Sequence, residues 1–89
     1  MNTNKSFNIS NKQATEQAHQ FDQQVGRNIQ YLRHILKISR QELADHIGVT
    51  QQQLAKYESA KNRISAGRLA LVAHKLYRNI NFFFEENKM

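Results

Sequence analysis

Polar side chains suited to reading nucleic-acid bases cluster near the middle of the chain. At about 100° per residue, Gln52, Lys56 and Ser59 fall on one side of a helix, and Leu54 falls on the opposite side. Gln51 points less directly outward, but it occupies the tip of the same helix. Glutamine can bond bidentately to adenine N6 and N7, and lysine can donate to guanine O6 and N7 or to a phosphate. An acid-free stripe of this kind is suited to base contacts in a DNA major groove.

Exposed Gln and Lys residues also occur on the wet face of any surface helix, so no one of these residues is informative alone. The combination is more specific, because the stripe lies on the second of two capped helices in a basic chain. We therefore favour groove recognition over an ordinary solvated face.

Two helix starts in quick succession must position this stripe. Ser39 with Glu42, and Thr50 with Gln53, have the spacing of a capping box, and Gly48 lies between them. Hydrophobic staples accompany both boxes: Ile38 with Leu43, and Val49 with Leu54. The spacing predicts helices over 40–47 and 51–59. Two short helices joined by a tight turn form a helix-turn-helix, whose second helix enters DNA.

Three further helices are predicted around this pair, which gives an all-α, five-helix fold. Apolar periodicity predicts one over 22–37 with Asp22 as N-cap, one from Ser65 to about Tyr77, and a short one at 80–84 capped by Asn81. Residues 1–21 are polar and are predicted to form a disordered arm, and residues 22–86 are predicted to form the domain. The alternative for the arm is a basic segment that reaches DNA, with Lys5 and Lys12 as its cations.

The overall composition points to a polyanionic partner in the cytoplasm. The 89 residues have a formal net charge of +6 and no cysteine, so there is no disulfide or thiolate metal site. No leader-like or membrane-length apolar run is present. The sequence lacks His-x-x-x-His pairs, triad motifs and phosphate-binding loops, so we expect no enzyme, metal or cofactor. We also expect no small-molecule switch within this chain.

Cations and hydroxyls around the second helix are suited to the DNA backbone. Arg40 begins the first short helix, where backbone N–H groups also favour an anion. Lys61, Asn62 and Arg63 form the loop after the second helix, and Thr50 caps that helix. Their contacts would supply salt-sensitive affinity that does not depend on base sequence.

An aromatic run near the C-terminus could serve the core or a dimer. One short helix cannot bury three adjacent phenylalanines on one side, so at least one ring must be exposed or covered by a partner. The alternative is that one or two rings close the core and the other is ordinary surface. We favour a two-fold dimer contact formed by Tyr77, Ile80, Phe82, Phe83 and Phe84.

Over 25–84 the chain contains Val25-Gly26, Ile29, Arg33, Gln41-Glu42-Leu43-Ala44, Gly48-Val49-Thr50, Leu54, Tyr57-Glu58, Ile64 and Leu76. With this set it resembles the lambda-repressor-like, Cro-type helix-turn-helix domains of the xenobiotic-response-element family. The resemblance implies a five-helix domain that binds a pseudo-palindromic operator as a homodimer, with Gln51, Gln52 and Lys56 facing bases. It also implies an Arg33–Glu58 pair that ties the first helix to the recognition helix. Ala60 departs from the pattern, since the family usually has Gly there.

The sequence thus predicts a sequence-specific, double-stranded DNA-binding transcriptional regulator, in particular a repressor. The alternative is a protein-interaction module of the same fold, such as an antitoxin or an inhibitor of another regulator. Such a module would use the basic face on an acidic protein.

Overall fold

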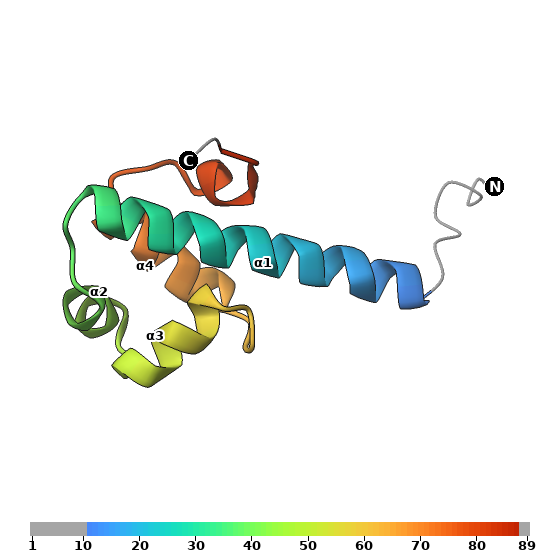
Figure 1. The fold of residues 1–89 in the computed structure, drawn as a ribbon, viewed down its shortest axis with the longest axis horizontal. Helices are drawn as coiled ribbons and strands as arrows, with labels where there is room; N and C mark the ends of the chain where they lie inside the picture. Colours follow the sequence, from blue (N-terminus) through green and yellow to red (C-terminus); the bar gives the residue numbers. More distant parts are fainter. Residues whose placement is uncertain (1–10, 88–89) are drawn as a thin grey trace.

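The computed structural model describes residues 11–87, which form four α-helices and one 3-10 helix (Figure 1). No helix in this range is long and apolar enough to cross a bilayer. A long first helix lies across the shorter ones, and the 3-10 helix packs against it (Figure 1). The elements are α1 (Asn11–Ile35), α2 (Arg40–Ile47), α3 (Gln51–Glu58), α4 (Ala66–Lys75) and η2 (Ile80–Phe84).

Helix α1 begins earlier than the sequence predicted. It starts at Asn11, so Asp22 lies inside the helix rather than at its N-cap, and 11–21 are helical rather than disordered. Lys, Gln, Ala and Glu favour helix, and extending a helix that already exists avoids the cost of nucleation. Residues 1–10, the rest of the predicted arm, lie outside the described range.

The predicted caps of the two central helices are confirmed. Ser39 Oγ accepts a hydrogen bond from the Glu42 N–H at 3.0 Å, and Thr50 Oγ1 accepts from the Gln53 N–H at 3.0 Å. Gly48 ends α2 with φ of 76°, a conformation that costs glycine little. These local interactions end one helix and begin the next, which sets α3 at an angle to α2.

The C-terminal element is a 3-10 helix, so the structure has four α-helices where five were predicted. Asn79, not Asn81, is its N-cap, with Oδ1 accepting from the Asn81 N–H at 2.8 Å. An element of this length offers few i→i+4 bonds, and the tighter 3-10 turn is common in short segments.

A buried asparagine that sequence reasoning missed holds this element on α1. Asn28 is fully buried, and its Nδ2 donates to the carbonyl oxygens of Phe82, Phe83 and Glu85 at 3.3, 3.0 and 2.9 Å. The Phe82 and Glu85 carbonyls also accept from Asn87 Nδ2, at 3.0 and 3.1 Å, so side-chain amides satisfy backbone carbonyls at the end of η2. Phe83 packs beside them in a core that contains Val25, Ile29, Leu32, Leu43, Ala44, Ile47, Leu54, Leu69, Val72, Ala73 and Leu76.

Candidate nucleic-acid interface

Helix α3 presents its polar stripe outward from a firmly seated inner face. Leu54 is fully buried and Glu58 is 7% exposed, and both point into the domain. The outer residues Gln51, Gln52, Lys56 and Ser59 are all exposed. The helix therefore has a rigid inner face and an accessible, acid-free outer face. This is the geometry that an element entering a major groove requires.

Gln51 is oriented by two side chains of α2. Its Nε2 donates to Gln41 Oε1, and Gln41 Nε2 in turn donates to Asp45 Oδ1 at 2.9 Å. The chain of amides fixes the Gln51 side chain at the tip of α3. The i,i+4 spacing of Gln41 and Asp45 was visible in the sequence. The contact between Gln41 and Gln51 depends on how the two helices meet.

Ser59 lies at the end of α3 rather than on its central face. It is the C-cap residue, and its Oγ donates to the Lys56 carbonyl at 3.3 Å. With this bond in place the hydroxyl can only accept a further hydrogen bond. Ser59 is also far from the N-terminal tip, where base contacts concentrate in helix-turn-helix proteins.

A buried carboxylate joins three elements behind the outer face of α3. The Arg33–Glu58 pair implied by the resemblance is present, with Arg33 Nε 2.8 Å from Oε2 and Nη2 3.3 Å from Oε1. Arg40 adds bonds to Oε1 from Nε at 3.2 Å and Nη2 at 3.1 Å. Bidentate arginine–carboxylate pairs fix orientation as well as distance. Glu58 therefore locks the C-terminal end of α3 to α1 and to the start of α2.

The bond to Glu58 adds a second role for Arg40, which was predicted only as a phosphate contact. Its side chain remains 39% exposed while Nε and Nη2 hold Glu58. A guanidinium has five N–H donors, so the same group can hold Glu58 and still donate to a phosphate. The carboxylate thus pre-orients the arginine at the edge of the interface.

The loop after α3 folds back on the end of the helix. The Lys61 and Asn62 N–H groups both donate to the Lys56 carbonyl, at 2.9 and 3.2 Å. Ala60 adopts φ of 62°, the left-handed conformation that explains the usual glycine there. The side chains of Lys61 and Asn62 are exposed, in the loop directly after α3.

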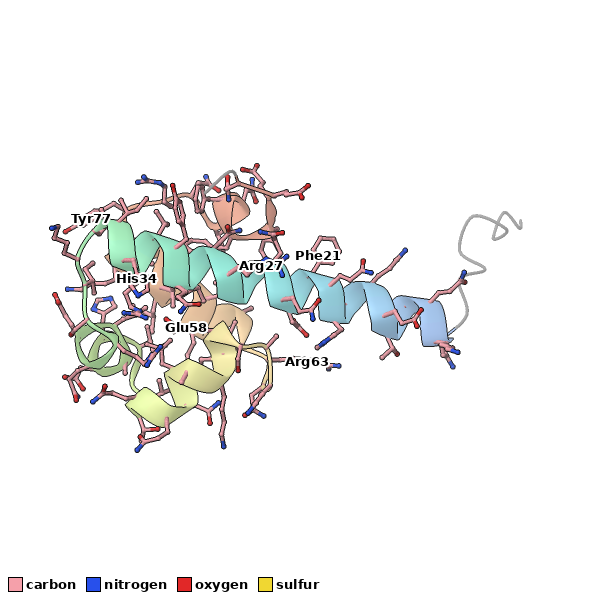
Figure 2. All side chains as sticks on the ribbon, viewed as in Figure 1. Phe21, Arg27, His34, Glu58, Arg63 and Tyr77 are labelled. Carbon is pink, nitrogen blue, oxygen red and sulfur yellow. The ribbon has the colours of Figure 1, made fainter. Side chains whose placement is uncertain are left out.

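Arg63 is exposed but paired with an acid. Its Nε lies 3.3 Å from Asp22 Oδ2 of α1, and 74% of its side chain remains exposed. Figure 2 shows Arg63 on the loop that follows α3. Asp22, which was predicted to cap the first helix, therefore binds the loop after α3 instead. Thr50, at the other end of α3, is exposed and accepts the capping bond through Oγ1, so its hydroxyl hydrogen is free to donate.

Helix α1 meets the end of α3 at a glycine. A Cβ on Gly26 would lie 2.4 Å from the Glu58 carbonyl oxygen and 2.7 Å from that of Tyr57. No side chain fits at these distances, because the two backbones are in direct contact. The sequence identified Gly26 only as part of the family motif. The contact between the two backbones, which explains why glycine is needed there, is visible only in the structure.

The aromatic residues predicted as a dimer contact do not form one surface. Phe83 is fully buried in the core, so its assignment to a dimer contact is wrong; η2 turns this ring toward α1. Phe82 is half-buried, with the Arg78 guanidinium 5.6 Å from its ring centre. Tyr77 is 79% exposed near the C-terminal end of α1 (Figure 2), whereas Phe84 contacts Phe21 farther along that helix. Ile80 is 37% exposed.

Comparisons with known proteins identify the family. Residues 29–81 match the family model described as Helix-turn-helix. The chain is 56% identical over 64 residues to an uncharacterized HTH-type transcriptional regulator of Rickettsia conorii, covering 72% of this chain and 51% of that protein. It is 40% identical over 72 residues to an uncharacterized transcriptional regulator in the ATPase CF(0) region of Rhodospirillum rubrum, covering 81% and 67%. The chain thus spans about half the length of the Rickettsia relative.

A solved structure has the same fold. The clp gene regulator ClgR from C. glutamicum superposes with a TM-score of 0.66 at 22% identity, covering 71% of this chain and 82% of that one. The match supports the helical architecture around α2 and α3. The family model and the sequence relatives show that the chain belongs to the xenobiotic-response-element type of helix-turn-helix transcriptional regulators, a membership that implies DNA binding.

Proposed function

We propose that this protein is a sequence-specific repressor that binds a pseudo-palindromic operator as a homodimer. In this proposal Gln51, Gln52 and Lys56 of α3 contact base edges in the major groove. Arg40, Thr50 and the 61–63 loop contact the DNA backbone, and Ser59 accepts a hydrogen bond at the end of α3. Two half-sites one helical turn apart require two subunits.

The observation that carries this proposal is the placement of charge around α3. The outer face of the helix contains Lys56 and no acid, while its one acid, Glu58, is buried and paired with Arg33 and Arg40. Further cations lie near this helix: Arg40, whose side chain is 39% exposed, and the exposed Lys61 and Arg63 of the loop that follows it. This surface attracts a polyanion and holds its base-reading side chains on a rigid support.

Selection of bound DNA from a random library tests the proposal, and two α3 variants test the residue assignments. Gln52→Ala and Lys56→Ala are each expected to weaken binding to the selected site by about 5- to 150-fold, the ratio for ~1–3 kcal/mol. Each should also relax sequence preference at the base pair that the side chain contacts. Gel shifts against the selected site and its single-base variants measure both effects.

A backbone contact provides the matched control for these variants. Lys61→Ala should weaken binding to all sequences alike and lower the slope of log affinity against log salt by about 1. Unchanged affinity and preference in Gln52→Ala and Lys56→Ala would show that α3 does not read bases. Failure of the library to yield any preferred sequence would favour the rival function, an interaction module for an acidic protein.

The Asp22–Arg63 pair predicts a variant that binds DNA more tightly. Asp22→Asn removes the carboxylate that holds Arg63, which leaves that guanidinium free for a phosphate. An exposed pair of this kind contributes at most about 1 kcal/mol, so we expect a two- to fivefold gain in affinity at low salt. The gain should be absent when Arg63→Ala is combined with Asp22→Asn. A gain that persists in the double variant would mean that Asp22 acts by general repulsion.

A further inference from the structure

The apolar stripe of α1 continues past the edge of the folded body. Val25 and Leu32 are 4% and 1% exposed and pack in the core. The same helical face extends toward the N-terminus through Phe21, Ala18 and Ala14, at spacings of four, three and four residues. Ala14 and Ala18 are exposed, and Phe21 is 53% exposed. The face that is core in one half of the helix is therefore uncovered in the other half (Figure 1).

A second aromatic ring extends this uncovered face. Phe84 of η2 is 43% exposed and packs edge-to-face on Phe21, with ring centres 6.2 Å apart. The two rings border a surface pocket of about 400 Å³. Ala14, Ala18, Phe21 and Phe84 are called the α1 seam below. Two half-exposed phenylalanines side by side are an unusual feature for solvent-facing surface.

The charge around the α1 seam indicates what kind of partner fits it. Gln17, Gln20 and Gln24 border it, and of the residues that line the pocket only Glu86 is charged. Asp22, on the other side of Phe21, is paired with Arg63 of the same chain. DNA or an acidic protein would select a cationic surface instead. Two copies of a chain of net charge +6 can approach with least repulsion through a patch that, like this one, has no cation in its lining.

We propose that the α1 seam is the homodimer interface, in which the N-terminal halves of α1 from two copies pack antiparallel. Phe21 then lies on Ala18 of the partner subunit, and the reverse contact follows by symmetry, so each large ring meets a small residue. The flanking Gln17 and Gln24 of opposite subunits come together as uncharged amides. This inference rests on the dimeric function proposed above and names its surface.

Helix geometry places both recognition helices on one side of such a dimer. Gly26, where α3 touches α1, lies about 100° around the helix from Val25 and the seam. The two-fold axis of an antiparallel pair is perpendicular to the plane of the two helices. It therefore runs roughly along the direction from α1 to α3, and both α3 helices fall on the same face.

The spacing of the two recognition helices agrees with one turn of DNA. With the axis midway between Ala18 and Phe21, the two Gly26 residues are about 20 Å apart along α1. Each α3 runs from there away from the axis (Figure 1) over its 8 residues, so the outer tips are at most about 44 Å apart. Centres of adjacent major-groove half-sites are about 34–36 Å apart, within this range.

The oligomeric state of the full chain, measured by sedimentation or light scattering at tens of micromolar, tests the interface. Ala18→Glu puts a charge at an exposed position of good helix propensity, so folding is preserved while Phe21 of the partner subunit meets a carboxylate. We expect the unmodified chain to be a dimer and Ala18→Glu to weaken dimerisation at least tenfold, with an unchanged helical circular dichroism spectrum. The control Gln23→Glu adds the same charge on the opposite, exposed face of α1 and should remain dimeric.

Several results would overturn the interface. These are a monomeric unmodified chain, a dimeric Ala18→Glu variant, or a dimer that Tyr77→Ser disrupts and Ala18→Glu does not. The selection of bound DNA from a random library tests the proposed function independently of the interface. If Ala18→Glu abolishes dimers but still selects a single half-site of the same sequence, both proposals stand. A dimer that depends on Ala18 but selects no DNA sequence would support the interface and contradict the proposed function.

Discussion

Glu58→Ala is expected to lower the free energy of unfolding by about 3–5 kcal/mol, the range for removing one partner of a buried ion pair. Arg33, whose side chain is 7% exposed, would keep its charge without a carboxylate. Arg40 would lose the same partner. The loss of both anchors should also free the end of α3 and weaken DNA binding. Urea unfolding followed by circular dichroism measures the stability, and gel shifts measure the binding.

An exposed ion pair elsewhere in the chain is the matched control. Glu42 Oε2 lies 3.3 Å from Lys75 Nζ, and the Glu42 side chain is 52% exposed. Glu42→Ala should therefore cost no more than about 1 kcal/mol. Similar losses in the Glu42 and Glu58 variants would contradict a special role for the buried network. A stable Glu58→Ala variant would mean that water reaches the Arg33 guanidinium readily.

Gly26→Ala is expected to destabilise the fold by about 1–3 kcal/mol, as overpacking does in a close-packed interior. The added Cβ would lie 2.4 Å from the Glu58 carbonyl oxygen, which is backbone and cannot rotate away. Relief requires α3 to move relative to α1. The same variant should therefore bind the selected DNA site more weakly even at temperatures where it is fully folded. Thermal unfolding and gel shifts at low temperature separate the two effects.

A second helical glycine shows what the same substitution does in open space. Gly67 lies in α4, and nothing lies within 4 Å of a Cβ placed there. Because alanine favours helix over glycine, Gly67→Ala should leave stability unchanged or raise it by up to about 1 kcal/mol. Equal stability of the two variants would refute the close approach of α1 and α3.

The elements fixed by local interactions were predicted well. Ser39 and Thr50 cap the two central helices through bonds to residues three positions later, and Gly48 supplies the turn between them. Such interactions depend on near neighbours in the chain, so spacing alone reveals them. The same pattern shows that Leu54 is inner and Gln52 outer on α3, as the structure has them.

The sequence-based predictions were wrong where the structure depends on contacts between distant residues or on how far an existing helix extends. The start of α1 was misplaced because Asp22 looks like a cap, whereas the segment before it extends a helix nucleated by packing farther on. Three adjacent phenylalanines gave no sign of which ring is buried. Phe83 is the buried ring because η2 docks on α1 through Asn28.

The sequence by itself determined the helix-turn-helix, its family and the polar face of its second helix, because caps, periodicity and composition are properties of neighbouring residues. The tertiary structure alone decided that Arg40 shares Glu58 with Arg33. It also decided that Asp22 pairs with Arg63, and that the apolar stripe of α1 continues beyond the part of the helix that packs on the core. These features join residues far apart in the chain, or depend on where the folded body ends. Their energies come from burial and charge pairing, which exist only once the helices have packed.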